Sequence, residues 1–165
     1  MIARHESLRT VFPDTDGVPR QEVLAPESAN LGWNVVDATG WSPARLSDAI
    51  DTVARHTFDV TTDIPLRAIL FRVTDDEHVL VGVVHHIAAD GWSITPPLVA
   101  DLSTAYVGRC AGHAPNWSEL PVQYVDYTLW QRARLGDLRD GQSLTSAQLA
   151  YWREALAGMP ERLQL

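Results

Sequence analysis

The chain has 165 residues and a formal net charge of −8, with 45% hydrophobic residues, 21% charged residues and one cysteine. This length and composition are typical of one globular domain with a sizeable core. The acidic balance argues against nucleic acid as a main partner, because nucleic-acid-binding domains favour a basic face. No apolar stretch reaches the roughly 20 residues that span a bilayer, so we expect no membrane partner. The lone cysteine fits a reducing, cytoplasmic location.

Several short strands are predicted in the first half of the chain. Residues 1–7 are typical of the last turns of a helix. Apolar runs at residues 8–12, 18–24 and 33–36 predict strands, because turn-forming residues bound them. Two later runs, residues 66–73 and 79–84, flank a pair of aspartates and predict a hairpin.

Four helices are predicted from their start and stop signals. Cap-plus-proline pairs at residues 42–43 and 95–96 predict two helix starts. Gly112 closes the second of these helices in the left-handed conformation. Residues 122–135 predict a third helix with an aromatic stripe that we expect to pack in a core. A capping box at residues 145–148 predicts the start of a fourth helix.

The most informative stretch follows the apolar run at residues 79–84, which ends in His85 and His86. The run has no polar alternation, which is typical of a strand buried on both faces. Neighbouring side chains in a strand point to opposite faces, so the two histidines face different surroundings. One histidine can therefore work as a base while the other is a structural partner. Asp90 and Gly91 then fall in the turn that leaves the strand.

Residues 85–91, with the sequence HHIAADG, resemble the HHxxxDG motif of condensation domains from nonribosomal peptide synthetases. The motif is also found, more distantly, in chloramphenicol acetyltransferase-like acyltransferases. Residues 4–12 match the family's RHExLRTxF pattern at every specified position, and residues 124–131 are similar to its YxDYxxWQ pattern. The resemblance implies an α/β fold, an α+β two-layer sandwich in which helices pack on a mixed sheet.

The resemblance also implies that residues 1–165 are a partial condensation domain, most of one N-terminal lobe. The family's first motif would precede Ala3, and the whole C-terminal lobe would follow Leu165. In the family the catalytic tunnel runs between the two lobes. The implied partners are therefore the missing C-terminal lobe and the donor and acceptor peptidyl carrier proteins. No cofactor is expected to bind directly, and the phosphopantetheine arms of the carriers enter as tethered substrates.

For this family, the resemblance implies amide bond formation between two carrier-tethered acyl thioesters in nonribosomal peptide biosynthesis. His86 is implied as the base or as the positioner of the acceptor amine, and both roles stay open. His85 is implied as a structural neighbour whose ring is held by hydrogen bonds. Asp90 is implied to pair with Arg4, although orienting His86 as in a triad is an alternative. Gly91 would permit a special turn geometry, and its amide could stabilise an oxyanion.

Other hypotheses compete with this one. The two histidines can be satisfied core residues, although the two further motifs make this the weaker interpretation. A metal site at His86 and Asp90 has no evident third ligand, so we expect none. The chain can also be a stand-alone acyltransferase of the same superfamily, a catalytically inactive fragment or a piece that docks carrier proteins.

Overall fold

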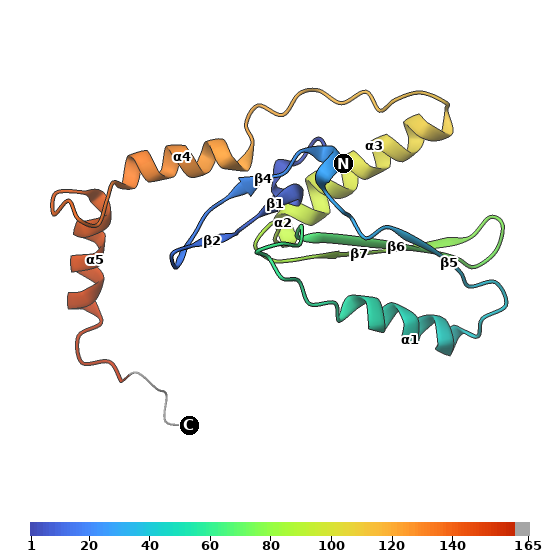
Figure 1. Ribbon diagram of the computed structural model, residues 1–165, viewed down its shortest axis with the longest axis horizontal. Helices are drawn as coiled ribbons and strands as arrows, with labels where there is room; N and C mark the ends of the chain where they lie inside the picture. Colours follow the sequence, from blue (N-terminus) through green and yellow to red (C-terminus); the bar gives the residue numbers. More distant parts are fainter. Residues whose placement is uncertain (161–165) are drawn as a thin grey trace. The chain divides into compact units, whose positions relative to one another are not determined.

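In the computed structural model, the hairpin that precedes the two histidines belongs to a three-stranded sheet, which Figure 1 shows. Its strands run in the order β5 (Asn34–Asp37), β6 (Leu66–Arg72) and β7 (His78–Val84). β5 is parallel to β6, and β6 is antiparallel to β7, with Leu66 opposite Val84. The predicted hairpin is therefore confirmed, and the sheet is mixed as expected.

The structure describes residues 1–160, apart from the side chains of Thr95 and Pro96. The chain divides into two units, Met1–Gln123 and Tyr124–Leu165, and each is described by itself. No helix in the described part of the chain is long and apolar enough to cross a membrane.

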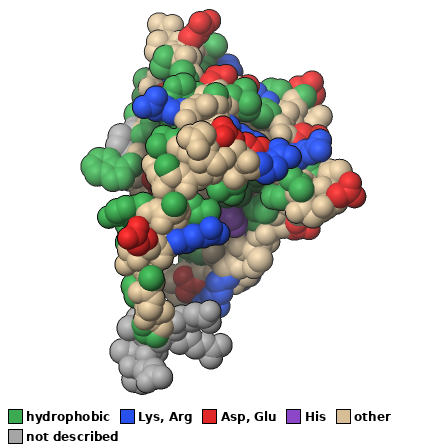
Figure 2. Space-filling view, turned by 90° about the vertical axis from the view of Figure 1, so that its left-hand side faces the viewer, with side chains coloured by type: hydrophobic (Ala, Val, Ile, Leu, Met, Phe, Trp, Pro, Cys, Tyr) green, Lys and Arg blue, Asp and Glu red, His purple; other side chains and the backbone are tan. Residues whose placement is uncertain are grey.

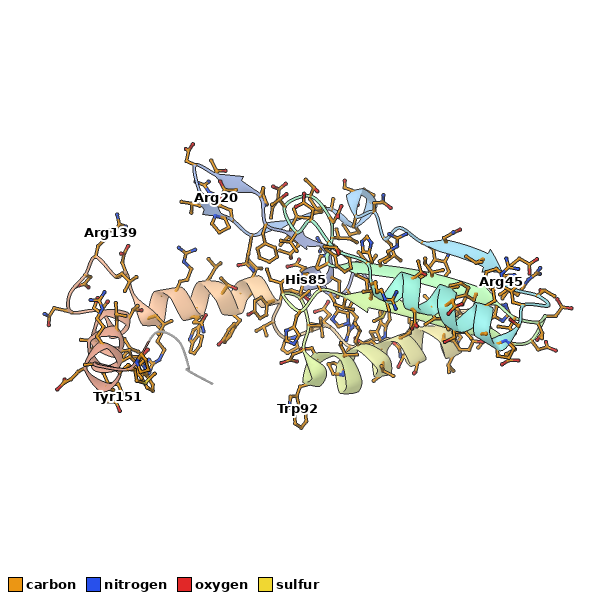
Figure 3. All side chains as sticks on the ribbon, turned by 90° about the horizontal axis from the view of Figure 1, so that it is seen from below. Arg20, Arg45, His85, Trp92, Arg139 and Tyr151 are labelled. Carbon is orange, nitrogen blue, oxygen red and sulfur yellow. The ribbon has the colours of Figure 1, made fainter. Side chains whose placement is uncertain are left out.

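Helix α1 (Pro43–Ala54) covers one face of the sheet and begins where the sequence predicted (Figures 1 and 3). The Ser42 hydroxyl accepts a hydrogen bond from the Arg45 amide, and Pro43 takes the first helical position. The helix follows β5 and crosses back to the parallel strand β6, as parallel pairing requires. Its apolar stripe packs against the buried residues Ala38, Ile69 and Phe71 through Leu46, Ala49, Ile50 and Val53.

The prediction that the run at residues 79–84 is buried on both faces is wrong for the described chain. Val79 and Val81 pack against the core under α1, but Leu80 on the other face is 45% exposed. β7 lies at an edge of the sheet and pairs with β6 in antiparallel fashion. An antiparallel sheet can leave one face open, so an unbroken apolar run alone does not establish two-sided burial.

The N-terminal strands are shorter than predicted and are divided into two small pairs. A 3₁₀ helix, η1, replaces the expected end of an α-helix. Gly17 turns one of the pairs with a φ of 76°, a conformation that glycine adopts without strain. The short elements are η1 (Glu6–Arg9), β1 (Thr10–Val11) paired with β4 (Glu22–Val23), β2 (Asp14–Thr15) paired with β3 (Val18–Pro19), and η2 (Pro26–Ser28).

The helix after the histidines begins earlier than the predicted start at residues 95–96. Asp90 is its N-cap, and the helical segment continues as far as Cys110. Pro97 lies inside a wide π-helical stretch, where its missing amide leaves a gap in the helical hydrogen bonds. Gly112 ends the segment with a φ of 79°, as predicted. In chain order the parts are α2 (Gly91–Ser93), η3 (Ile94–Leu98) and α3 (Val99–Cys110).

The second unit contains α4 (Tyr124–Leu135) and α5 (Leu144–Ala155). α4 confirms the predicted third helix. The predicted capping box at residues 145–148 is wrong, because Ser143 is the N-cap of α5 and accepts from the Ser146 amide. The Thr145 hydroxyl instead donates to the Leu135 carbonyl at the end of α4.

Many hydrophobic side chains lie on the surface, as the face drawn in Figure 2 shows. Among the exposed hydrophobic residues are Tyr124, Tyr127 and Trp130, which form the aromatic stripe of α4. Tyr127 lies between Tyr124 and Trp130, with ring centroids 5.7 Å from each. The three side chains are 42–59% exposed, so the predicted core packing of this stripe is wrong for the described chain.

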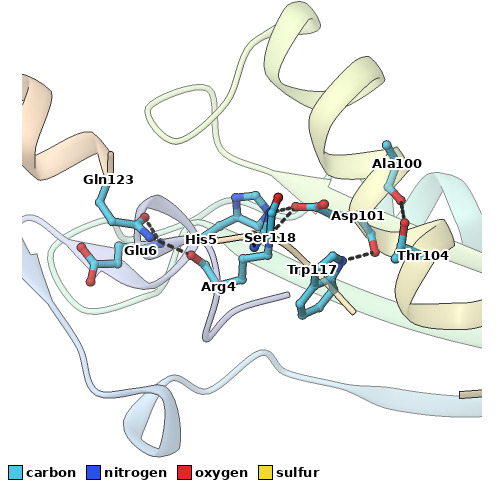
Figure 4. A network of polar contacts seen from close by, with 9 residues as sticks. All are labelled: Arg4, His5, Glu6, Ala100, Asp101, Thr104, Trp117, Ser118 and Gln123. Carbon is cyan, nitrogen blue, oxygen red and sulfur yellow. Dashed lines mark hydrogen bonds and ion pairs between the residues drawn. The ribbon is translucent and has the colours of Figure 1, made fainter. Parts of the chain in front are cut away.

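Asp101 on α3 holds the N-terminal residues Arg4 and His5 against this helix (Figure 4). Its Oδ2 accepts hydrogen bonds from Arg4 Nε at 2.6 Å and from His5 Nε2 at 2.8 Å. The Arg4 guanidinium also lies over the Trp117 ring, 5.2 Å from its centroid. The Arg4 and Asp101 side chains are only 14% and 17% exposed, so their charges need the hydrogen bonds that they make within the protein.

Replacing Asp101 with alanine would leave the donors of Arg4 and His5 without their acceptor. We expect Asp101→Ala to lower the free energy of unfolding by about 1–3 kcal/mol, the cost of an unsatisfied buried polar group. Asp48→Ala is the matched control, because Asp48 is an exposed aspartate on α1. Urea unfolding measures both variants, and equal losses would contradict this role of Asp101.

The same cluster predicts a loss of stability at low pH. Burial lowers the pKa of His5 from its ordinary 6.5, and this effect outweighs the opposing hydrogen bond to Asp101. Burial raises the pKa of Asp101, but the bonds from Arg4 and His5 prevail and bring it below its ordinary 3.8. In both cases the unfolded chain binds more protons, so stability is present above the ordinary pKa and is lost as pH falls.

We therefore expect the free energy of unfolding to fall as pH drops below 6.5, and again below 3.8. Urea unfolding between pH 8 and pH 3 measures this, and His5→Gln should flatten the first decline. An unchanged first decline in His5→Gln would assign it to another group.

Candidate active site

The predicted motif occupies a strand end, a turn and a helix start. β7 ends at Val84, and the His85 amide extends its pairing by donating to the Pro65 carbonyl at 3.0 Å. A turn follows, closed by the Ala88 amide, which donates to the His85 carbonyl at 3.0 Å. Asp90 then begins the helical segment. Figure 3 shows His85 at the end of the hairpin and Trp92 pointing away from the helix start.

The His85 ring is half-buried and held on two sides. Its Nδ1 accepts a hydrogen bond from the Ile87 amide at 3.1 Å. The Phe58 ring meets it edge-on, with centroids 6.1 Å apart and an interplanar angle of 87°. Sequence reasoning did not single out Phe58, because the residue lies in the loop after α1 and its contact with His85 is made only through folding.

His86 has a different environment from His85, because β7 ends at Val84 and His86 lies in the turn that follows. It lies in the turn and is exposed. No hydrogen bond joins its ring to any residue that the structure describes, so both ring nitrogens are open to an incoming group. A neutral imidazole with a free nitrogen can accept a proton near neutral pH.

Asp90 is the N-cap of α2 and does not contact Arg4. Its Oδ1 accepts from the Ser93 amide at 2.8 Å and from the Ser93 hydroxyl at 2.7 Å. These hydrogen bonds, the one from the hydroxyl first, lower the pKa of Asp90, so its carboxylate is ionised at neutral pH. The first amides of a helix lack intrahelical partners, and the Asp90 carboxylate supplies an acceptor for one of them, the Ser93 amide.

The predicted Arg4–Asp90 pair is therefore wrong, and the Arg4 guanidinium pairs with Asp101 instead. The alternative, in which Asp90 orients His86, also has no hydrogen bond to support it among the described residues. Both aspartates follow the histidines in the sequence, and a motif pattern does not say which carboxylate the arginine reaches.

Gly91 occupies the first position of α2 with an ordinary helical backbone. A Cβ added there would meet nothing within 4 Å, and its φ is not in the left-handed region. The expectation that Gly91 adopts a turn geometry reserved for glycine is therefore wrong. The expectation that its amide stabilises an oxyanion stays a prediction.

An apolar cavity of about 290 Å³ lies on the strand face that precedes His86. Leu80, Gly82 and Val84 of β7 line one side, and Leu98 and Leu102 of the following helical segment line another. Among the residues that the structure describes, no group of three or more His, Cys, Asp or Glu side chains is placed to hold a metal ion.

The comparisons with known proteins agree with these motifs. The family model described as "Condensation domain" matches residues 1–165. The chain is 66% identical over its whole length to the isonitrile lipopeptide synthase of Mycobacterium tuberculosis (strain ATCC 25618 / H37Rv). It is 44% identical over its whole length to the dimodular nonribosomal peptide synthase of Bacillus subtilis (strain 168). It spans only 6% and 7% of the lengths of these two relatives.

A solved structure is similar over nearly the whole chain. The complex of the X-domain and OxyB from teicoplanin biosynthesis matches with 36% identity and a TM-score of 0.86. The match covers 99% of this chain and 35% of that one. The starter condensation domain of rhizomide synthetase, with a TM-score of 0.71 at 22% identity, shares the fold. The predicted chloramphenicol acetyltransferase-like fold is confirmed, and the chain belongs to the condensation domain family of nonribosomal peptide synthetases.

Proposed function

We propose that the complete protein forms an amide bond between two acyl groups held as thioesters on carrier proteins. The observation that carries this proposal is the exposed His86 ring, which has no hydrogen-bond partner among residues 1–160 and lies in the turn that joins β7 to α2. Membership of the condensation domain family supports it, because the reaction is the one for which the family is named.

In the proposed reaction, the α-amine of the acceptor attacks the carbonyl carbon of the donor thioester. A carbon–nitrogen bond forms, the carbon–sulfur bond breaks, and the donor arm leaves as a thiolate that takes up a proton. His86 either accepts the proton that the amine loses or holds the neutral amine in line with the carbonyl. The Gly91 amide, at the start of α2, is proposed to stabilise the oxyanion.

The proposed partners are a donor and an acceptor peptidyl carrier protein, whose phosphopantetheine arms deliver the two thioesters. This chain covers about a third of the related X-domain chain. We propose that it supplies His86 and one wall of the site, and that the rest of a two-lobed domain supplies the other wall. The 165 residues alone are then expected to be inactive.

A docking role without catalysis is a second candidate. It is favoured by the likeness to an X-domain that was solved in complex with another protein, OxyB. Replacing His86 separates the two functions, because docking does not need a free imidazole at this position.

His86→Ala should lower the rate of amide formation about 10²–10⁴-fold, the contribution typical of a general acid–base residue. The assay uses the complete protein with loaded carriers and measures product by mass spectrometry. His78→Ala is the matched control, because His78 is an exposed histidine at the start of the same strand. Unchanged product formation by His86→Ala would contradict the catalytic role of His86 and favour the docking function.

Asp90→Ala should also slow amide formation, because the helix start that follows His86 loses its cap. Asp90→Ser should retain activity, since serine is an equally good N-cap. The same carrier assay measures both, and circular dichroism checks the fold. Equal loss in the two variants would show that the negative charge of Asp90 matters rather than its capping bond.

A further inference from the structure

Four half-buried side chains form a cluster behind the turn that carries His86. Phe58 lies between two histidines, with its ring 4.6 Å from the His56 ring and 6.1 Å from the His85 ring. Both contacts are edge-to-face, at 83° and 87°. Arg67 on β6 completes the cluster through a hydrogen bond to His56. The loop after α1, the strand β6 and the end of β7 therefore meet at this point.

The hydrogen bonds determine which nitrogen of each histidine carries the proton. Arg67 Nη1 lies 3.1 Å from His56 Nδ1, and a guanidinium can only donate. His56 therefore accepts at Nδ1 and carries its proton on Nε2. The Ile87 amide, also only a donor, lies 3.1 Å from His85 Nδ1. His85 is therefore held as the neutral tautomer with its proton on Nε2.

His85 makes three hydrogen bonds that together fix the turn. Its amide donates to the Pro65 carbonyl at 3.0 Å, and its carbonyl accepts from the Ala88 amide at 3.0 Å. Its ring accepts from the Ile87 amide. His86 lies between His85 and Ile87 in the chain. The backbone on both sides of His86 is therefore fixed by the hydrogen bonds of His85.

Arg67 is placed for orientation rather than for charge pairing. It has no carboxylate partner among the described residues, and its Nε is buried without a hydrogen-bond partner. A buried arginine usually gains its stability from a carboxylate or a carbonyl, and an unmade bond there costs free energy. The contact that Arg67 does make supports the His56 ring, which in turn supports Phe58 against His85.

We propose that His85 is a positioning residue whose Nδ1 acceptor fixes the turn that presents His86, and that Phe58 and the Arg67–His56 pair hold the His85 ring in place. This inference rests on the proposed function of His86, because positioning matters only if His86 takes part in amide formation. In this proposal the His85 ring acts through the backbone of Ile87, whose amide it binds.

A pair of variants tests the position of the acceptor. In His85→Asn the amide oxygen takes the place of Nδ1 and can still accept from the Ile87 amide, whereas in His85→Gln the oxygen takes the place of Nε2 and cannot. We expect His85→Gln to lower kcat for amide formation about 10²-fold with an unchanged KM, as a misplaced catalytic group does. His85→Asn should stay within about tenfold of the parent, and His78→Gln is the matched control.

Deuterium uptake by the peptide of residues 85–90 gives a second readout that does not depend on activity. Uptake should stay slow in the parent and in His85→Asn and become fast in His85→Gln, because the Ile87 amide then has no acceptor. Phe58→Leu, which keeps the acceptor but removes the edge-on ring, should raise uptake by a smaller factor and is available if His85→Gln does not fold.

The two proposals fail in different ways. A parent protein that forms no amide contradicts the proposed function. The deuterium-uptake experiment still tests whether His85 fixes the turn, because it does not depend on activity. Equal uptake and equal kcat in His85→Asn and His85→Gln would overturn the positioning role. A loss of kcat in both variants with slow uptake in both would also overturn it, because the turn in His85→Gln would then be intact without the acceptor for the Ile87 amide.

Discussion

The register between β6 and β7 decides where each residue of the candidate site lies. Leu66 pairs with Val84, so Pro65 comes opposite His85 and binds its amide. The His85 ring then contacts Phe58, while His86 lies exposed in the turn. A slip of one residue would move the side chains of β7 to the opposite face of the sheet, because side chains in a strand alternate between faces.

Two aspartates fix different parts of the helical segment that follows this hairpin. Asp90 holds the start of the helical segment through Ser93, and Asp101 holds Arg4 and His5 against the same segment. The segment between them therefore has a fixed beginning and a fixed contact with the N-terminal residues. Its apolar side faces the cavity beside β7, so the hairpin, the helix and the N-terminal residues form one unit around the motif.

Most elements were predicted because their signals are local. The Ser42 cap with Pro43, the hairpin from β6 to β7 and the Gly112 helix end each depend on residues a few positions apart. The wrong helix starts have a common cause. At residues 95–96 and 145–148 a plausible cap was present, but an earlier residue, Asp90 or Ser143, already supplied the acceptor. Several residues can serve as a cap, and only the fold decides which one does.

The sequence by itself determined the family and the mixed α/β fold, because motif spacing and the patterns of helix and strand residues are properties of the chain. The tertiary structure alone decided which carboxylate Arg4 reaches, which face of β7 is open and which ring supports His85. Those contacts join segments far apart in the chain, such as Arg4 with Asp101 and Phe58 with His85. A local pattern cannot rank such partners, since their distance is set by how the sheet and helices pack.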